Sequence, residues 1–130
     1  MATGEFTGTT LSANASGDVA ANRFVKMATT ANETLLVIEC TDGQQAIGIS
    51  THAAADGEAV GVAVDGVGLL YVNAANANIA AMSLLNCIAA DGVGGVEAVD
   101  GEPYNAIALE PSTADGDKIR VLIVNAMRGA

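Results

Sequence analysis

Six Asp-Gly dipeptides divide most of this chain into short apolar runs. They are Asp42-Gly43, Asp56-Gly57, Asp65-Gly66, Asp91-Gly92, Asp100-Gly101 and Asp115-Gly116. An Asp-Gly pair supplies the positive φ angles that tight hairpin turns need. The runs cover residues 23–27, 35–40, 46–50, 59–64, 68–72, 84–89, 96–99, 106–109 and 119–124. Short strands with turns at roughly ten-residue spacing predict an all-β fold, a compact small β-barrel or sandwich of short antiparallel strands.

Two segments depart from this pattern. Residues 1–18 are mostly Thr, Ser, Gly, Ala and Asn, which predicts a flexible or extended N-terminal arm in front of a single β domain over residues 19–130. In the second segment, Asn76 or Asn78 is a suitable N-cap for a helix of at most three turns through residues 79–82. Because periodicity does not separate a short helix from a short strand there, both alternatives stay open.

The chain also contains an internal repeat. Residues 46–49 (AIGI) lead to 56–64 (DGEAVGVAV), and residues 106–109 (AIAL) lead to 115–124 (DGDKIRVLIV). Each copy has the pattern of a strand, a loop with Asp-Gly followed by an acid, and a second strand. Two copies are too few for a solenoid, so we predict a β domain with two similar strand-loop-strand halves.

Charge and composition exclude several classes of protein. The 130 residues include 15 Asp+Glu and 5 Lys+Arg, for a net charge of -10, so the surface would repel a nucleic-acid backbone. Apolar residues make up 51% of the chain, which argues against disorder. Many of these residues are alanines, which bury little area each, so association with other copies or with a partner would add needed burial.

No targeting or membrane signal is evident in the chain. The N-terminus has neither a basic segment nor an apolar segment, so we do not expect a signal peptide. Residues 66–90 are uncharged, but they contain several Asn and Gly residues and no flanking Lys or Arg, which argues against a membrane span. We therefore expect a soluble protein made in a cytoplasm.

The residues that most often carry chemistry form no recognisable motif. His52 is the single histidine and no G-x-S-x-G surrounds any serine, so a surface-loop histidine is the simplest interpretation. Cys40 and Cys87 lie far apart in sequence, which predicts buried thiols, with a disulfide as the alternative. Asp56-Gly-Glu58 and Asp115-Gly-Asp117 do not continue into a calcium loop. We predict no catalytic residue, no metal site and no cofactor.

Taken in order, these elements resemble the capsid cement (decoration) proteins of tailed bacteriophages over roughly residues 20–124. That family has an iG-[IV] strand, a hairpin of the form aaaGe-x-V-x-V-x-G-V and a final hairpin of the form AIAlE…aDGd-x-I-R-V-L-[IL]. The matching segments here are residues 46–49, 54–68, 106–110, 114–117 and 119–123. The uncharged stretch at 73–82 and the polar arm depart from the family pattern.

The resemblance implies a structural, non-enzymatic protein that binds the outside of a phage head and bridges major capsid subunits. It implies a homo-oligomer, usually a trimer, in contact with the major capsid protein but with neither nucleic acid nor membrane. We expect the arm to dock by strand addition and the scarce cations to pair with acidic capsid groups. Candidate contact residues are Phe6, Thr7, Thr9, Thr10, Arg23, Lys26, Tyr71, Tyr104 and Arg128. For the two tyrosines, ordinary core packing is the alternative.

Three other functions stay open at the level of sequence. A carbohydrate- or receptor-binding module would need ring stacking, yet aromatics are only 3% of the chain. A phage tail or baseplate β domain has no feature that separates it from a head protein. A hydrolase would have to use His52 and acidic residues.

Overall fold

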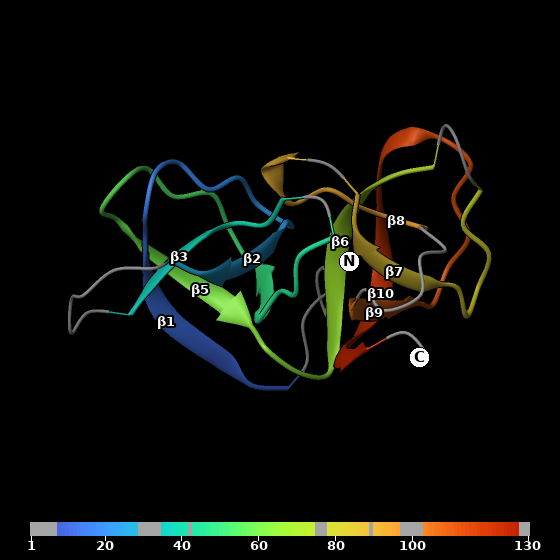
Figure 1. Cartoon of the computed structure of the whole chain (residues 1–130), viewed down its shortest axis with the longest axis horizontal. Coiled ribbons are helices and arrows are strands. Elements are labelled where there is room, and N and C mark those ends of the chain that lie inside the picture. Colours follow the sequence, from blue (N-terminus) through green and yellow to red (C-terminus); the bar gives the residue numbers. More distant parts are fainter. Residues whose placement is uncertain are drawn as a thin grey trace.

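The computed structural model describes residues 8–28, 35–41, 43–74, 78–88, 90–96 and 103–127, and they form two closed β-barrels side by side (Figure 1). The first barrel contains β1 (Thr10–Ala15), β2 (Phe24–Met27), β3 (Leu36–Glu39), β4 (Gly48–Ser50) and β5 (Ala59–Ala63). The second contains β6 (Val67–Asn73), β7 (Leu84–Cys87), β8 (Gly94–Gly95), β9 (Pro103–Ala108) and β10 (Asp115–Met127). A single 3-10 turn, η1 (Ala90–Gly92), precedes β8. The prediction of a small all-β fold is therefore confirmed.

The two barrels have the same strand order. The neighbours run β1-β3-β2-β4-β5 in the first barrel and β6-β8-β7-β9-β10 in the second, and each barrel closes between its first and last strand. Isolated bridges join Val19 to Ala54 and Ile79 to Ser112 at corresponding places. The predicted repeat covers β4–β5 and β9–β10, which are equivalent strand pairs, and the topological match extends over all five strands of each half.

Two details differ from the sequence expectations, and the structure answers a third question that the sequence left open. Residues 10–15, inside the segment expected to be an arm, form β1, whose Ala13 and Ala15 side chains are buried in the first barrel. Each barrel has one parallel pair, β1 with β3 and β6 with β8, among otherwise antiparallel strands. Residues 78–82 form a bridge and a turn and not a helix, because Ile79 pairs with Ser112; Asn76 lies outside the described residues.

The interior of the molecule consists of two clusters that do not coincide with the two barrels. The smaller cluster fills the first barrel with inward residues such as Val25, Val60 and Val62. The larger cluster fills the second barrel, and it also contains Phe24 and Ile49 from the outer face of the first. The junction between the barrels is therefore part of the main core.

Glycine admits the Phe24 ring to the second barrel. A Cβ atom on Gly94 in β8 would lie 3.1 Å from Phe24 Cε2 and 2.5 Å from Leu70 Cδ2. β8 is also the shortest strand of this barrel and pairs with β6 only through Val72 and Gly94. The first barrel has Val37 at the topologically equivalent position, since Val37 pairs with Ala15 of β1. We conclude that the absence of a side chain at Gly94 makes room for the junction.

Hydrogen bonds from the backbone and from one buried side chain connect the two barrels. The Gly92 N–H donates to the Cys40 carbonyl and the Gly43 N–H donates to the Cys87 carbonyl, both at 2.9 Å. The buried Asn105 of β9 accepts from the Ala46 N–H at 3.1 Å and donates to the Gln44 carbonyl at 3.2 Å. These bonds satisfy polar groups that the junction removes from water, so the contact is specific as well as apolar.

Candidate interaction surface

The residues predicted to contact a capsid lie in different surroundings in the structure. Phe6, Thr7 and Arg128 lie outside the described residues. Thr9 and Thr10 are exposed at the beginning of β1. The Thr9 N–H donates to Asp65 Oδ1 at 2.6 Å, and Thr10 lies opposite Ala63 of β5. The backbone of this part of the expected arm is therefore paired within the chain.

Arg23 and Tyr71, which were predicted as independent contact residues, lie together at the barrel junction. The Arg23 guanidinium carbon lies 4.2 Å from the centre of the Tyr71 ring, and its Nη1 donates to the Asp91 carbonyl at 3.0 Å. The Tyr71 N–H donates to the Asn22 carbonyl at 2.8 Å. A cation–π contact of this kind contributes about 0.5–1 kcal/mol at a partly exposed site. Both side chains are half-buried and contribute to the contact between the barrels.

The remaining two predicted residues lie apart. Lys26 is half-buried on β2, opposite Ile38 of β3. Tyr104 is half-buried on β9, opposite Ala126 of β10. The structure thus brings only Arg23 and Tyr71 into contact among the predicted residues it describes.

The residues with catalytic or redox chemistry have structural roles in this fold. His52 Nε2 accepts from the Gly61 N–H at 3.2 Å, which assigns the proton to Nδ1, where it is donated to the Ala53 carbonyl at 3.0 Å. Cys40 and Cys87 are buried thiols in the main core. Burial, together with the nearby Cys87 and against the opposing effect of Lys26, raises the pKa of Cys40 to about 12. Such a thiol is a poor nucleophile at neutral pH.

The described residues contain no cluster of three or more metal-ligating side chains. None of their helices is both long and apolar enough to span a membrane.

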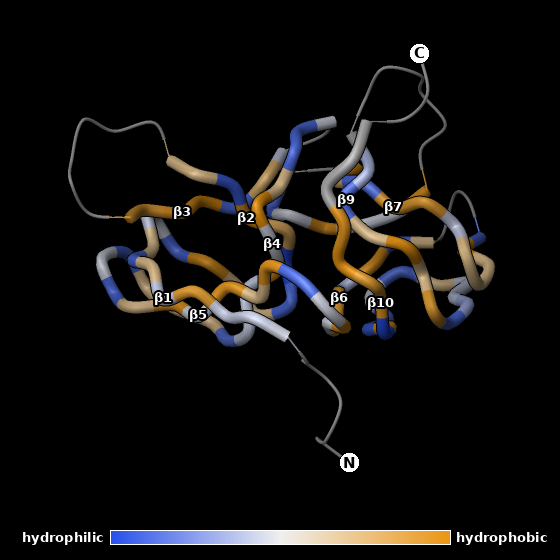
Figure 2. Tube along the Cα trace, turned by 90° about the horizontal axis from the view of Figure 1, so that it is seen from below, coloured by the Kyte–Doolittle hydropathy of each residue, from blue (hydrophilic) through white to orange (hydrophobic). Residues whose placement is uncertain are grey.

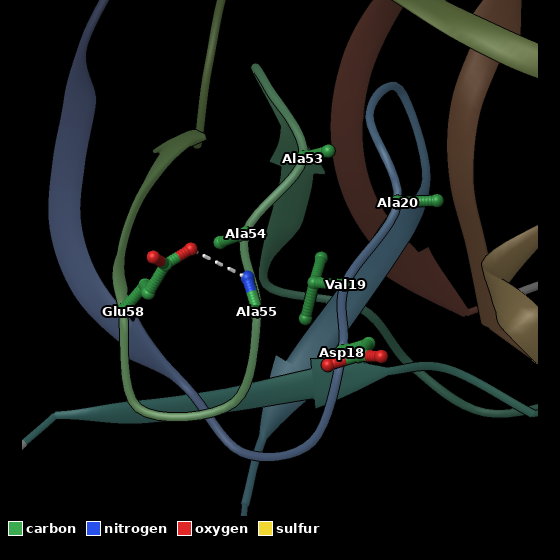
Figure 3. A pocket seen from close by; sticks show the side chains of 7 residues that line it. All are labelled: Asp18, Val19, Ala20, Ala53, Ala54, Ala55 and Glu58. Carbon is green, nitrogen blue, oxygen red and sulfur yellow. Dashed lines mark hydrogen bonds between the residues drawn. The ribbon is translucent and has the colours of Figure 1, made fainter.

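A shallow depression of about 430 Å³ lies on the first barrel (Figure 3). Four alanines and Val19 line it together with two acids, Asp18 from the turn after β1 and Glu58 from the loop before β5. Glu58 Oε1 accepts from the Ala55 N–H at 2.8 Å, and Asp18 Oδ1 accepts from the Asp56 N–H at 3.1 Å. The Asp18 bond connects the turn after β1 to the loop before β5, and the Glu58 bond closes that loop on itself, so both acids are accounted for as structural groups.

Several large apolar side chains of the predicted strands and of the segment 79–82 lie partly in solvent. On the second barrel they are Met82, Leu109 and Leu122, with Leu84 and Ile107 half-buried beside them. The register places Leu84 opposite Ile107, and Ile107 opposite Leu122. Figure 2 shows the hydrophobic colour on β7 and β9, which lie side by side. The alternation of residues along β9 and β10 predicts that these side chains point outward. It does not predict that they remain partly exposed to solvent.

Comparison with protein-family models and with curated protein sequences gives no match. Among solved structures, the chain is similar to the crystal structure of the head fiber gp8.5 N base in bacteriophage phi29. The TM-score is 0.72 at 12% sequence identity, and the alignment covers 94% of this chain and 98% of that chain. At this identity the similarity establishes a shared fold over almost the whole length of both chains.

Proposed function

We propose that this chain is a structural, non-enzymatic protein of a bacteriophage virion that binds the outer surface of the head. The observation that carries the proposal is its fold, which is similar over nearly its full length to the base of a phage head fiber. The ordered motifs of residues 46–49, 54–68 and 106–123, which resemble those of capsid cement proteins, support the same assignment independently.

The proposed mechanism is mechanical. Each copy bridges adjacent major capsid subunits, and the free energy of that contact is added to the free energy needed to separate them. Copies made in the host cytoplasm assemble as a homo-oligomer, with a trimer favoured, and several weak contacts to one particle act together. The net charge of -10 suits an exterior position, because it keeps the protein away from packaged DNA. Neither a metal nor a cofactor enters this mechanism.

A cosedimentation experiment tests the proposal. Purified full-length protein is mixed with heads that lack it, from a phage whose genome encodes this chain, and separately with isolated tails of the same phage. We expect saturable binding to heads only, and an increase in the temperature at which the shells break. Binding to tails alone would assign the protein to the tail or baseplate. Binding to neither would overturn the proposal, and a glycan array would then test the carbohydrate-binding alternative.

A further inference from the structure

The duplicated fold allows the same outer face to be compared on the two barrels. In the first barrel Phe24 lies opposite Ile49, and Ile49 lies opposite Ala63. In the second barrel the same three strands place Leu84 opposite Ile107, and Ile107 opposite Leu122. The two rows therefore occupy equivalent positions in the two barrels.

A turn before β2 and β7 extends the correspondence. Asn22 and Met82 each lie two residues before the strand, and both have positive φ, at 62° and 75°. The Asn22 N–H donates to the Ser50 carbonyl at 2.9 Å, and the Met82 N–H donates to the Ala108 carbonyl at 2.7 Å. Met82 therefore extends the row of the second barrel where Asn22 extends the row of the first.

On the first barrel, this face is the junction with the second. Phe24, Ile49 and Ala63 are at most 1% exposed and belong to the main core. Asn22 donates from Nδ2 to the Leu69 carbonyl at 3.2 Å. The molecule itself thus shows that a barrel of this topology packs another barrel of the same topology against this face.

On the second barrel, the equivalent face is partly exposed among the residues that the structure describes. We call it the β7–β9–β10 face and define it by Met82, Leu84, Ile107, Leu109 and Leu122. Met82 is 72% exposed and Leu122 is 38% exposed. The face is continuous with the existing junction along β9, where the buried Asn105 contacts the first barrel and Ile107 follows two residues later. Contiguous exposed apolar side chains of this kind mark interaction surfaces.

Charge favours a second copy of this chain as the occupant. The net charge of -10 opposes contact between copies over most of their surface. The described charged side chains of β10 are Asp115 and Asp117 at its beginning, where Asp117 accepts from the Ser112 hydroxyl at 2.7 Å, and Lys118 and Arg120, which alternate outward with Leu122. The nearby Glu110 is paired with Arg120 at 3.4 Å, so the cations lie nearer the face than the two aspartates do. A second, acidic copy can approach there without bringing two acidic surfaces together.

The geometry points to the β7–β9–β10 face as the self-association surface, on which a second copy of this chain packs one of its barrels. This inference deepens the proposed virion assembly and rests on it, because it identifies the surface through which copies meet. A second chain then covers the outer row of the second barrel, just as the second barrel of the same chain covers the outer row of the first.

The test is the solution mass of the full-length protein by sedimentation equilibrium, with a variant in each barrel. Leu122→Glu places a charge on the β7–β9–β10 face, and Ile38→Glu is the matched control, since Ile38 is an outward residue of the first barrel with 37% exposure. We expect the wild type and Ile38→Glu to form the same oligomer, and Leu122→Glu to weaken its association constant by about tenfold or more. Met82→Glu, at the most exposed position of the face, should weaken the association constant too, and with 72% exposure at this position we expect the variant to fold.

Two results of the mass measurement overturn the inference. The first is a wild type that stays monomeric at high concentration. The second is that Leu122→Glu, Met82→Glu and Ile38→Glu all associate equally. The head-binding assay separates this failure from failure of the proposed function. A monomeric wild type that binds heads through this face would leave the virion role intact and assign the face to a capsid subunit. An oligomer that Leu122→Glu disrupts, but that binds no head, would overturn the virion role alone.

Discussion

The two barrels have one topology but use the same face for opposite purposes. In the first barrel the outward row through Phe24 and Ile49 is as deeply buried as any interior residue. In the second barrel the equivalent row through Leu84 and Ile107 stays partly in solvent. The comparison teaches that strand order alone does not decide which residues of such a barrel form core. The neighbour that the rest of the chain supplies decides it.

A second difference lies at the bridges that precede β5 and β10. The first barrel has Ala54 at this position, and a depression opens beside it. The second barrel has Ser112, whose hydroxyl donates to Asp117 Oδ2 at 2.7 Å. A change from a methyl group to a hydroxymethyl group thus provides the Asp117 carboxylate, near the beginning of β10, with a side-chain partner.

The largest effect should come from Phe24→Ala compared with Leu84→Ala, its equivalent. Removing the Phe24 ring leaves a cavity in the main core, so we expect unfolding free energy to fall by about 3–5 kcal/mol. Leu84→Ala should cost only about 1 kcal/mol, because its side chain is already partly in solvent. Urea unfolding measures both. Equal costs would show that the two faces are equivalent in the monomer.

Gly92→Ala compared with Gly57→Ala tests the junction separately from backbone strain. Both glycines have positive φ, at 70° and 83°, so either substitution costs about 1–2 kcal/mol in strain. A Cβ on Gly92 would also collide with the Phe24 carbonyl, whereas nothing lies within 4 Å of one on Gly57. We expect Gly92→Ala to cost about 1–3 kcal/mol more than Gly57→Ala in thermal or urea unfolding. A difference near zero would contradict the close approach of the two barrels.

Ser112→Ala should have a smaller effect, limited to the second barrel. The variant removes the hydroxyl donor to Asp117, and water replaces it at an exposed carboxylate, so we expect a loss of about 1 kcal/mol. In the reciprocal change, Ala54→Ser, the new hydroxyl has no aspartate placed as Asp117 is beside Ser112. We therefore expect the unfolding free energy to change by less than about 0.5 kcal/mol. Calorimetry of both variants measures the difference. A gain in stability from Ala54→Ser as large as the loss from Ser112→Ala would contradict this, because it would show that the first barrel can form the same hydroxyl contact.

The smallest effect should come from Glu110→Gln beside the β7–β9–β10 face. The Arg120 N–H and guanidinium hold the pKa of Glu110 below its usual range. A lowered pKa in the folded state stabilises the fold above the unfolded pKa of about 4.3, and that contribution disappears as the pH falls through the folded pKa. Both groups are partly exposed, so the variant should lose less than about 1 kcal/mol at pH 7. Urea unfolding at pH 7 and pH 2.5 measures this loss, which should vanish at the lower pH.

Much of the fold was predictable from local sequence. The Asp-Gly turns and apolar runs located eight of the ten strands, all except β1 and the two-residue β8, which lies just before the predicted run at 96–99; the repeat located β4–β5 and β9–β10 as similar halves. β1 was missed because its outward residues are Thr, Ser and Asn and its buried residues are small alanines, with Leu11 as its one large apolar side chain. The contact between Arg23 and Tyr71 could not be predicted, because 47 intervening positions carry no information about which barrels pack together.

The sequence by itself determined the strand class, the turns and the duplication, because a two-residue alternation and a positive-φ turn are local properties of a chain. Only the tertiary structure decided that Phe24 is core while Leu84 is partly surface, and that the thiols of Cys40 and Cys87 share one interior. Those outcomes depend on which surface of one barrel meets the other. Non-local packing sets this arrangement, and glycine at position 94 permits it.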